Sequence, residues 1–309
     1  MQLFAGSSHP QLAQEIAEYL KIKTSPLELH RFPDGEIEVR ILESVRGQDV
    51  FALQTIALDP NNLLVELLII IDALKRASAR SITAVTPYFG YCRQDRKDQP
   101  REPITAKLVA NMLVCAGANH VLTMDLHAGQ LEGFFDIPVD HIHSLPILAQ
   151  AFKEMGLQQL VVVAPDVGSV KLAHKYASFL NVDFAIVDKH RLNATTVETV
   201  SLIGDVKDKN VLLADDMCST AGTLVSAAKA CHGKGAKRIF AAVTHGIFVG
   251  DAVERIEKSP IEALFVSNTV PSNGRLDGSS KIRTVSVASS FGHAIHCITS
   301  QESIASRRQ

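Results

Sequence analysis

Two adjacent carboxylates and a run of small hydroxyl residues form the stretch best suited to chemistry. Asp215 and Asp216 end the apolar run 211–214, and a helical pattern begins at Leu224. This order predicts a buried strand, a tight loop and a helix N-terminus. The backbone N–H groups of such a loop can hold a phosphate, and the carboxylates suit sugar hydroxyls or a metal ion. A phosphorylated sugar therefore fits the whole stretch, with the candidate ligands Asp215, Asp216, Ser219, Thr220, Ala221, Gly222 and Thr223.

An acidic strand end followed by an ordinary helix cap is the simpler interpretation of this stretch. The Thr-Ala-Gly-Thr run at 220–223 favours the phosphate site over that alternative. No Gly-Lys-Ser or Gly-Lys-Thr sequence ends the loop, so a Walker-type nucleotide site is not expected.

A second candidate is the polar stretch 91–103, which follows the predicted strand 82–86. It carries four cations within nine residues. Because arginine binds phosphate oxygens through two hydrogen bonds at once, such a cluster in a near-neutral protein suits a polyphosphate. A solvated surface loop with balancing acids is the alternative. The four cations are Arg93, Arg96, Lys97 and Arg101.

Two further strand ends carry possible metal ligands. Asp125 and His127 follow the predicted strand 121–124, and Asp166 follows the predicted strand 160–164. Ligands of α/β proteins bind at the carboxyl ends of strands. Both positions also have a plainer explanation, since a lone histidine is often structural and Asp166 could cap the helix 170–180.

Two more segments combine groups that could act on a nucleotide. Lys189 and Arg191 follow the strand 183–187, where cations can neutralise charge that develops during phosphoryl transfer. A solvated basic turn is the alternative. The segment 32–36 pairs Phe32 with two acids at a Pro-Gly turn, and a core phenylalanine beside a polar turn is the alternative there.

The elements that must position these residues alternate between strand and helix. A helix ending in small residues and followed directly by a β-branched strand recurs at 77–85, 116–124 and 233–241. This alternation predicts βαβ units and parallel sheets. The fold expected is α/β with two similar domains, each a mostly parallel sheet flanked by helices. We place their boundary at 143, giving domains 1–143 and 144–309, with about the last 15 residues able to pack back on the first domain.

The composition excludes several classes of protein. With 309 residues, 46% of them hydrophobic and 21% charged, the chain is expected to form an ordered soluble globule. A formal net charge of −2 argues against a general nucleic-acid or membrane-surface binder. No signal peptide is evident, and the five scattered cysteines suit a reducing cytoplasm.

Two of these motifs resemble those of known enzymes. The stretch 215–223 resembles the phosphoribosyl-diphosphate loop shared by phosphoribosyltransferases and ribose-phosphate pyrophosphokinases. The Arg-Gln-Asp-Arg-Lys string at 93–97 resembles the adenine-nucleotide loop of the pyrophosphokinases alone. Because the similarity runs from Phe4 to Ile304 with the motifs in the family's order, the chain is identified as a member of the ribose-phosphate pyrophosphokinases.

The resemblance implies an activity and a set of residue roles. Such an enzyme transfers the β,γ-diphosphoryl group of ATP to the C1 hydroxyl of ribose 5-phosphate, and Mg²⁺ takes part. The domains would be of phosphoribosyltransferase type. The implied roles are ATP binding for Phe32, Asp34, Gly35, Glu36, Arg93 and Gln94, metal binding for His127 and Asp166, catalysis for Lys189 and Arg191, and ribose 5-phosphate binding for Arg191 and the 215–223 residues named above.

The resemblance also implies a homo-oligomer, of the hexamer-of-dimers type, because the turn at 32–36 reaches the nucleotide of a neighbouring subunit in that family. Two residues depart from the family pattern: Ser219 replaces a usual acid and Ser169 replaces a usual glycine. A phosphoribosyltransferase and a non-catalytic regulatory paralogue are the alternatives. The string at 93–97 argues against the first, and the retained acids and cations argue against the second.

Overall fold

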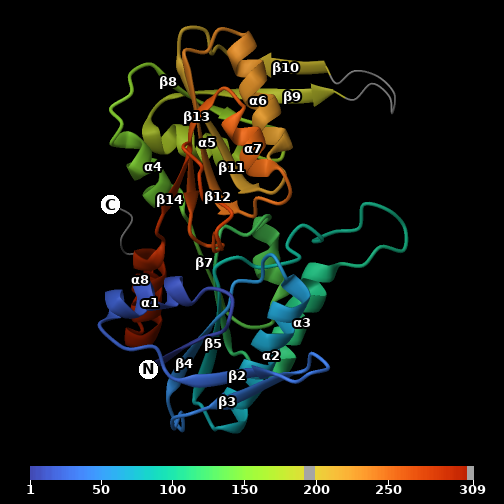
Figure 1. The fold of residues 1–309 in the computed structure, drawn as a ribbon, viewed down its shortest axis with the longest axis vertical. Helices are drawn as coiled ribbons and strands as arrows, with labels where there is room; N and C mark the ends of the chain where they lie inside the picture. The colour runs from blue at the N-terminus through green and yellow to red at the C-terminus, as the bar shows by residue number, and fades with distance from the viewer. Residues whose placement is uncertain (191–198, 305–309) are drawn as a thin grey trace. The chain divides into compact units, whose positions relative to one another are not determined.

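The computed structural model describes residues 1–190 and 199–304, and the chain divides into two compact units (Figure 1). Unit 1 contains Met1–His143, Thr269–Pro271 and the C-terminal segment from Ser286. Unit 2 contains Ser144–Asn268 and Ser272–Val285. The predicted functional domains 1–143 and 144–309 stay a prediction. The compact units differ from them in one respect, because the segment from Ser286 belongs to unit 1.

Unit 1 is built on a parallel sheet of five strands in the order β1-β4-β5-β6-β7. Helices α1 and α8 pack together on one side of this sheet, and α2 and α3 lie on the other (Figure 1). Both faces are thus covered, as the nearly continuous apolar strands require. The elements are β1 (Gln2–Ala5), α1 (Pro10–Leu20), β4 (Asp49–Leu53), α2 (Pro60–Arg76), β5 (Ser81–Thr86), α3 (Thr105–Ala116), β6 (His120–Met124), η1 (Gly129–Phe134), β7 (Val139–Ile142) and α8 (Ala288–Ser300).

A two-stranded antiparallel hairpin is inserted between α1 and β4. Its strands are β2 (Leu27–Arg31) and β3 (Ile37–Ile41), and β3 lies against α2. At its turn the Glu36 N–H donates to the Asp34 carboxylate at 3.2 Å, and Gly35 has φ +96°. This combination of an Asx bond and a left-handed glycine closes the turn.

Unit 2 is built on a seven-stranded sheet in the order β10-β9-β8-β11-β12-β13-β14. Only the edge pair β9–β10 is antiparallel. Helices α4 and α5 cover one face and α6 and α7 cover the other. The elements are α4 (Leu145–Lys153), β8 (Leu160–Ala164), α5 (Val170–Leu180), β9 (Asp183–His190), β10 (Thr199–Ile203), β11 (Asn210–Cys218), α6 (Gly222–Gly233), β12 (Arg238–Gly246), α7 (Ala252–Glu257), β13 (Ile261–Ser267) and β14 (Ile282–Val285).

Strand β11 shows why the run 211–214 is apolar without a break. Its side chains alternate between the two faces of the sheet. Val211 and Leu213 belong to the core beneath α6 and α7. Leu212 and Ala214 belong to the core beneath α4 and α5. The run buried on both faces is therefore apolar, and the first acid, Asp215, comes where pairing with β8 has ended while pairing with β12 continues.

The strand order of unit 2 reverses between β8 and β11. From β8 the chain continues outward to β9 and β10, whereas from β11 it continues in the other direction to β12 and β13. The connecting helices α5 and α6 therefore leave on opposite faces. Open α/β sheets bind ligands at the carboxyl ends of strands at such a point.

The expected fold class is confirmed by this architecture. Both large sheets are mostly parallel and flanked by helices. Across the described part of the chain, no helix combines the length and apolar character needed to cross a bilayer.

Gly90 offers a test of the packing at the carboxyl end of the unit 1 sheet. A Cβ at this position would lie 2.5 Å from Ile56 Cγ2 and 2.6 Å from the Ile56 backbone oxygen. We expect Gly90→Ala to lower the free energy of unfolding by about 1–3 kcal/mol, because the backbone of Ile56 must move. Urea unfolding measures the effect. Gly133→Ala is the control, since its Cβ would meet open space, and equal stability of the two variants would contradict the expectation.

Candidate functional site

The carboxyl ends of β8 and β11 bring two predicted acids to one hydroxyl group. The strands pair from Asn210↔Leu160 to Leu213↔Val163, so Asp166, which follows β8, and Asp215, within β11, both lie just beyond the last paired positions. The Ser169 Oγ lies 2.9 Å from Asp166 Oδ1 and 2.7 Å from Asp215 Oδ1. The Ser169 N–H also donates to Asp166 at 3.0 Å. The serine that replaces the family's usual glycine thus joins the two acids.

This arrangement changes the charge of Asp215. Burial first, and then the negative charges of Asp216 and Asp166, raise the pKa of Asp215 to about 8, against the effect of the Ser169 hydrogen bond. The Ser169 hydroxyl has one proton to share between Asp166 and Asp215, and Asp215 Oδ1 also accepts the Asp216 N–H at 2.9 Å. These hydrogen bonds favour the ionised carboxyl of Asp215, but the effect of burial outweighs them.

The loop after β11 presents backbone N–H groups at the start of α6. Ala221 adopts the left-handed conformation (φ 61°, ψ 4°), and its carbonyl accepts from Val225 N–H at 2.9 Å. The loop is held from outside, because Cys218 O accepts from Ile247 N–H and Ser219 O accepts from Val249 N–H. No side chain of the described chain caps this helix N-terminus. The N–H groups of its first turn therefore suit an anion.

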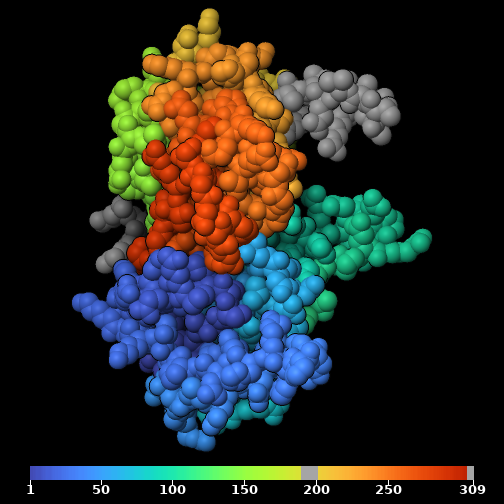
Figure 2. Space-filling view, in the orientation of Figure 1, coloured from blue at the N-terminus to red at the C-terminus, as the bar shows by residue number. Residues whose placement is uncertain are grey.

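The cationic loop 91–103 stands out from the rest of unit 1 (Figure 2). Its base is fixed by Gln94, whose carbonyl accepts from Ala106 N–H at 3.1 Å and whose side chain pairs with Thr105 at the start of α3. Arg93 is exposed, and Arg96 pairs with Asp98 at 2.8 Å. The loop thus offers cations to solvent from an anchored base.

A second link connects this loop to the segment after β6. The Gln130 side chain donates to Asp95 at 2.9 Å. Gln130 lies in η1, which begins two residues after the exposed His127. The structure thereby brings the predicted nucleotide loop and the Asp-Leu-His loop together within unit 1.

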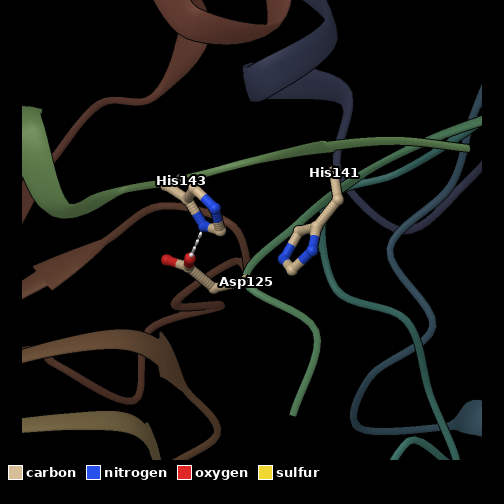
Figure 3. Close-up of side chains that lie close together, drawn as sticks. All are labelled: Asp125, His141 and His143. Carbon is tan, nitrogen blue, oxygen red and sulfur yellow. Dashed lines mark hydrogen bonds and ion pairs between the residues drawn. The ribbon is translucent and has the colours of Figure 1, made fainter. Parts of the chain in front are cut away.

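Asp125, which follows β6, lies beside two histidines that sequence analysis did not select (Figure 3). His143 Nδ1 lies 2.8 Å from Asp125 Oδ1, and the His141 and His143 rings meet edge to face at 4.6 Å. Asp125 has φ +37°, an unusual conformation for a residue with a side chain. The signal that could have found the histidines is their place at the end of β7, since α/β proteins bind ligands at the carboxyl ends of strands.

The predicted adenine-binding turn lies elsewhere in unit 1. Phe32 is 49% exposed at the tip of the β2–β3 hairpin, beside Asp34, Gly35 and Glu36. Figure 1 shows this tip well separated from the loop 91–103. Within one chain, the structure does not bring these two predicted parts of an ATP site together.

The predicted catalytic cations fall at the limit of what the structure describes. The Lys189 backbone belongs to β9 and pairs with Val200 of β10. Arg191 lies outside the described residues. Their roles stay predictions.

Comparison with known proteins identifies relatives over nearly the whole chain. Residues 1–117 match the family model described as the N-terminal domain of ribose phosphate pyrophosphokinase, and residues 192–307 match the phosphoribosyl synthetase-associated domain. Ribose-phosphate pyrophosphokinases of Clostridium perfringens and Chlorobaculum tepidum are each 52% identical; both alignments cover 98% of this chain, with 95% and 94% of those relatives. The crystal structure of phosphoribosylpyrophosphate synthetase from Mycobacterium smegmatis superposes with a TM-score of 0.92 at 39% identity, covering 97% of this chain and 99% of that one.

The raised pKa of Asp215 predicts how stability depends on pH. Between about pH 4 and 8 the folded protein keeps a proton on Asp215 that the unfolded chain has lost, so the free energy of unfolding falls as pH rises. Asparagine has the shape of the neutral acid and does not ionise. We expect Asp215→Asn to reduce this slope and to be more stable than the wild type at pH 8, by about 1–3 kcal/mol.

Urea unfolding at pH 5 and pH 8, without metal or substrates, measures this effect. Asp277→Asn, at an exposed site in unit 2, is the matched control and should follow the wild type. A slope that is equally steep in Asp215→Asn and the wild type would show that Asp215 is ionised in the folded protein.

Proposed function

The chain belongs to the ribose-phosphate pyrophosphokinase family, and we propose that its described strand ends supply the binding groups for that family's reaction. The enzyme is a ribose-phosphate diphosphokinase: it transfers the β,γ-diphosphoryl group of ATP to the C1 hydroxyl of ribose 5-phosphate, giving 5-phosphoribosyl 1-diphosphate and AMP. The observation that carries the residue assignment is the joining of Asp166 and Asp215 at the switch point of unit 2.

Ribose 5-phosphate is assigned to the end of β11. The 5-phosphate binds the backbone N–H groups of residues 219–223, which is supported by the uncapped start of α6. Asp215 and Asp216 accept hydrogen bonds from the ribose hydroxyls, as carboxylates can. Ser219 donates a hydroxyl hydrogen bond where an acid is usual. The left-handed Ala221 directs successive N–H groups to one side, in the manner of an anion-binding nest.

ATP is assigned to unit 1. Arg93 binds phosphate oxygens, and Gln94 holds the loop base at α3, which is supported by its contacts to Thr105 and Ala106. The adenine stacks on the exposed Phe32 of another copy of the chain, with Asp34, Gly35 and Glu36 contacting its polar edge. Support for this arrangement is the separation of the hairpin from its own cationic loop.

Mg²⁺ binding is assigned to Asp166 in unit 2 and to His127 in unit 1. Carboxylate oxygens are the ligands that this cation prefers, so the acids beside Ser169 fit it, whereas an imidazole suits a contact through water. When bound, Mg²⁺ would neutralise negative charge on the phosphates. A proton on Asp215 reduces the repulsion between this side chain and the neighbouring carboxylates of Asp166 and Asp216 while no cation or sugar is bound.

The chain's own residues supply position and charge for the transfer. The C1 hydroxyl attacks the β-phosphorus in line, and Lys189 and Arg191 stabilise the charge that develops there. Phosphoryl transfer depends mainly on positioning and charge neutralisation, so no strong base is assigned. A cytoplasmic location belongs to the same proposal and is supported by the five cysteines, none of which forms a disulfide.

The assignment of Lys189 predicts a loss of turnover. Lys189→Ala should lower kcat by roughly 10²–10³-fold, the range for losing one preorganised donor. AMP release from ATP, Mg²⁺ and ribose 5-phosphate measures this. Lys175→Ala, on α5, is the control and should retain wild-type turnover. Unchanged kcat in Lys189→Ala would reject the role.

The assignment of the hairpin to a neighbouring subunit predicts rescue on mixing. Phe32→Ala and Lys189→Ala damage different parts of the site, so a mixed oligomer contains some sites with both parts intact. We expect activity well above the sum of the two separate variants after joint unfolding and refolding. Each variant refolded alone is the control. Activity equal to the sum would place the hairpin in its own chain's site.

A further inference from the structure

Three potential metal ligands converge where β6 and β7 end. The strands are parallel, with Thr123 opposite His141 and Met124 opposite Ile142. His141 thus lies in β7, His143 follows the last residue of that strand, and the two rings meet edge to face at 4.6 Å. Asp125 turns out of β6 beside them, and one donor atom from each of the three side chains lies within 4.8 Å of the others (Figure 3). Within residues 1–190 and 199–304, this is the one group of three such donors.

His141 is oriented as metal-bound histidines are. Its Nδ1–H donates to Glu132 at 2.6 Å, so Nε2 carries the lone pair. That lone pair accepts the Leu126 N–H at 2.9 Å. Burial lowers the pKa of His141 and favours the neutral imidazole that a metal requires. An outer carboxylate of this kind fixes the tautomer and the ring orientation of a histidine that binds a metal.

Asp125 and His143 complete the set from either side. Asp125 is 8% exposed and its carboxylate already meets His143 Nδ1 at 2.8 Å. The His143 side chain is 41% exposed, which gives an ion a route from solvent. One carboxylate and two imidazoles suit zinc and its first-row neighbours, whereas Mg²⁺ and Ca²⁺ prefer oxygen ligands.

We propose that Asp125, His141 and His143 bind one divalent transition-metal ion. This set of ligands is distinct from the two Mg²⁺ ligands proposed above, His127 and Asp166. When the ion binds, His141 Nε2 coordinates it and no longer accepts the Leu126 N–H. His143 coordinates through Nδ1 and carries its proton on Nε2, so a neutral ring stays neutral. Leu126 lies between Asp125 and His127, and the loss of its hydrogen bond lets the ion change the conformation of the His127 loop.

The test uses Zn²⁺ alone, with no nucleotide or sugar, so that its outcome is independent of the proposed catalytic roles. Isothermal titration should give one strong site per chain in the wild type. His143→Gln keeps an amide donor for Asp125 but removes the imidazole, and should weaken binding at least about tenfold. Glu132→Gln alters only the outer hydrogen-bond partner of His141 and should weaken Zn²⁺ binding by about 10–100-fold.

His232→Gln is the matched control, because His232 is an exposed histidine at the end of α6. Its affinity should equal that of the wild type. The visible spectrum of Co²⁺ in the same site should show tetrahedral nitrogen and oxygen ligation and should be lost in His143→Gln. Glu132 is half exposed, so Glu132→Gln keeps the test decisive if the histidine variant fails to fold. Absence of a strong site, unchanged affinity in both variants, or equal displacement by Mg²⁺ would overturn the proposal.

Discussion

The hydrogen-bonded pairing of β8 with β11 is the constraint on which the candidate sugar site depends. Four paired positions set the two strands side by side at the point where the sheet order reverses. The segments that follow β8 and β11 lead to helices on opposite faces of the sheet, and Asp166 and Asp215 lie where these segments separate. Carboxylates held together in this way repel one another when all are ionised, and this repulsion adds to burial in raising the pKa of Asp215. A cation or a sugar would relieve the same electrostatic cost.

In unit 1, hydrogen bonds fix the loop that follows β6. The loop after β6 is fixed by the Asp125 N–H donating to Ile142 and by the Leu126 N–H donating to His141. His141 is fixed in turn by Glu132 on η1. His127 thus projects from a loop whose first two amides are anchored while its own side chain is exposed. The carboxyl ends of parallel strands serve both units, as expected for open α/β sheets.

The alternation of apolar strands and helices was sufficient to predict the α/β class, because that signal is local and repeats along the chain. The predicted strand ends at Asp125, Asp166 and Asp215 also follow from local patterns. The strand pairing that brings Asp166 close to Asp215 is non-local. The residues of 160–164 and 211–214 do not indicate that these two strands are neighbours in the sheet. Ser169 looked like a departure from a family pattern, and its contact with both acids needs the three-dimensional fold. His141 and His143 were missed because their hydrogen-bond partners after β6, Leu126 and Asp125, lie 15 and 18 residues away in the chain. The membership of α8 in unit 1 depends on contacts with α1 at the other end of the sequence.

The contact between Gln130 and Asp95 has a consequence for local motion. It ties the cationic loop to η1, while Gln94 ties the same loop to α3. Segments joined in this way open and close as one cooperative element, with a single free energy of opening. Amide hydrogen exchange of the two loops would then be correlated, and a ligand that orders either loop would slow exchange in the other.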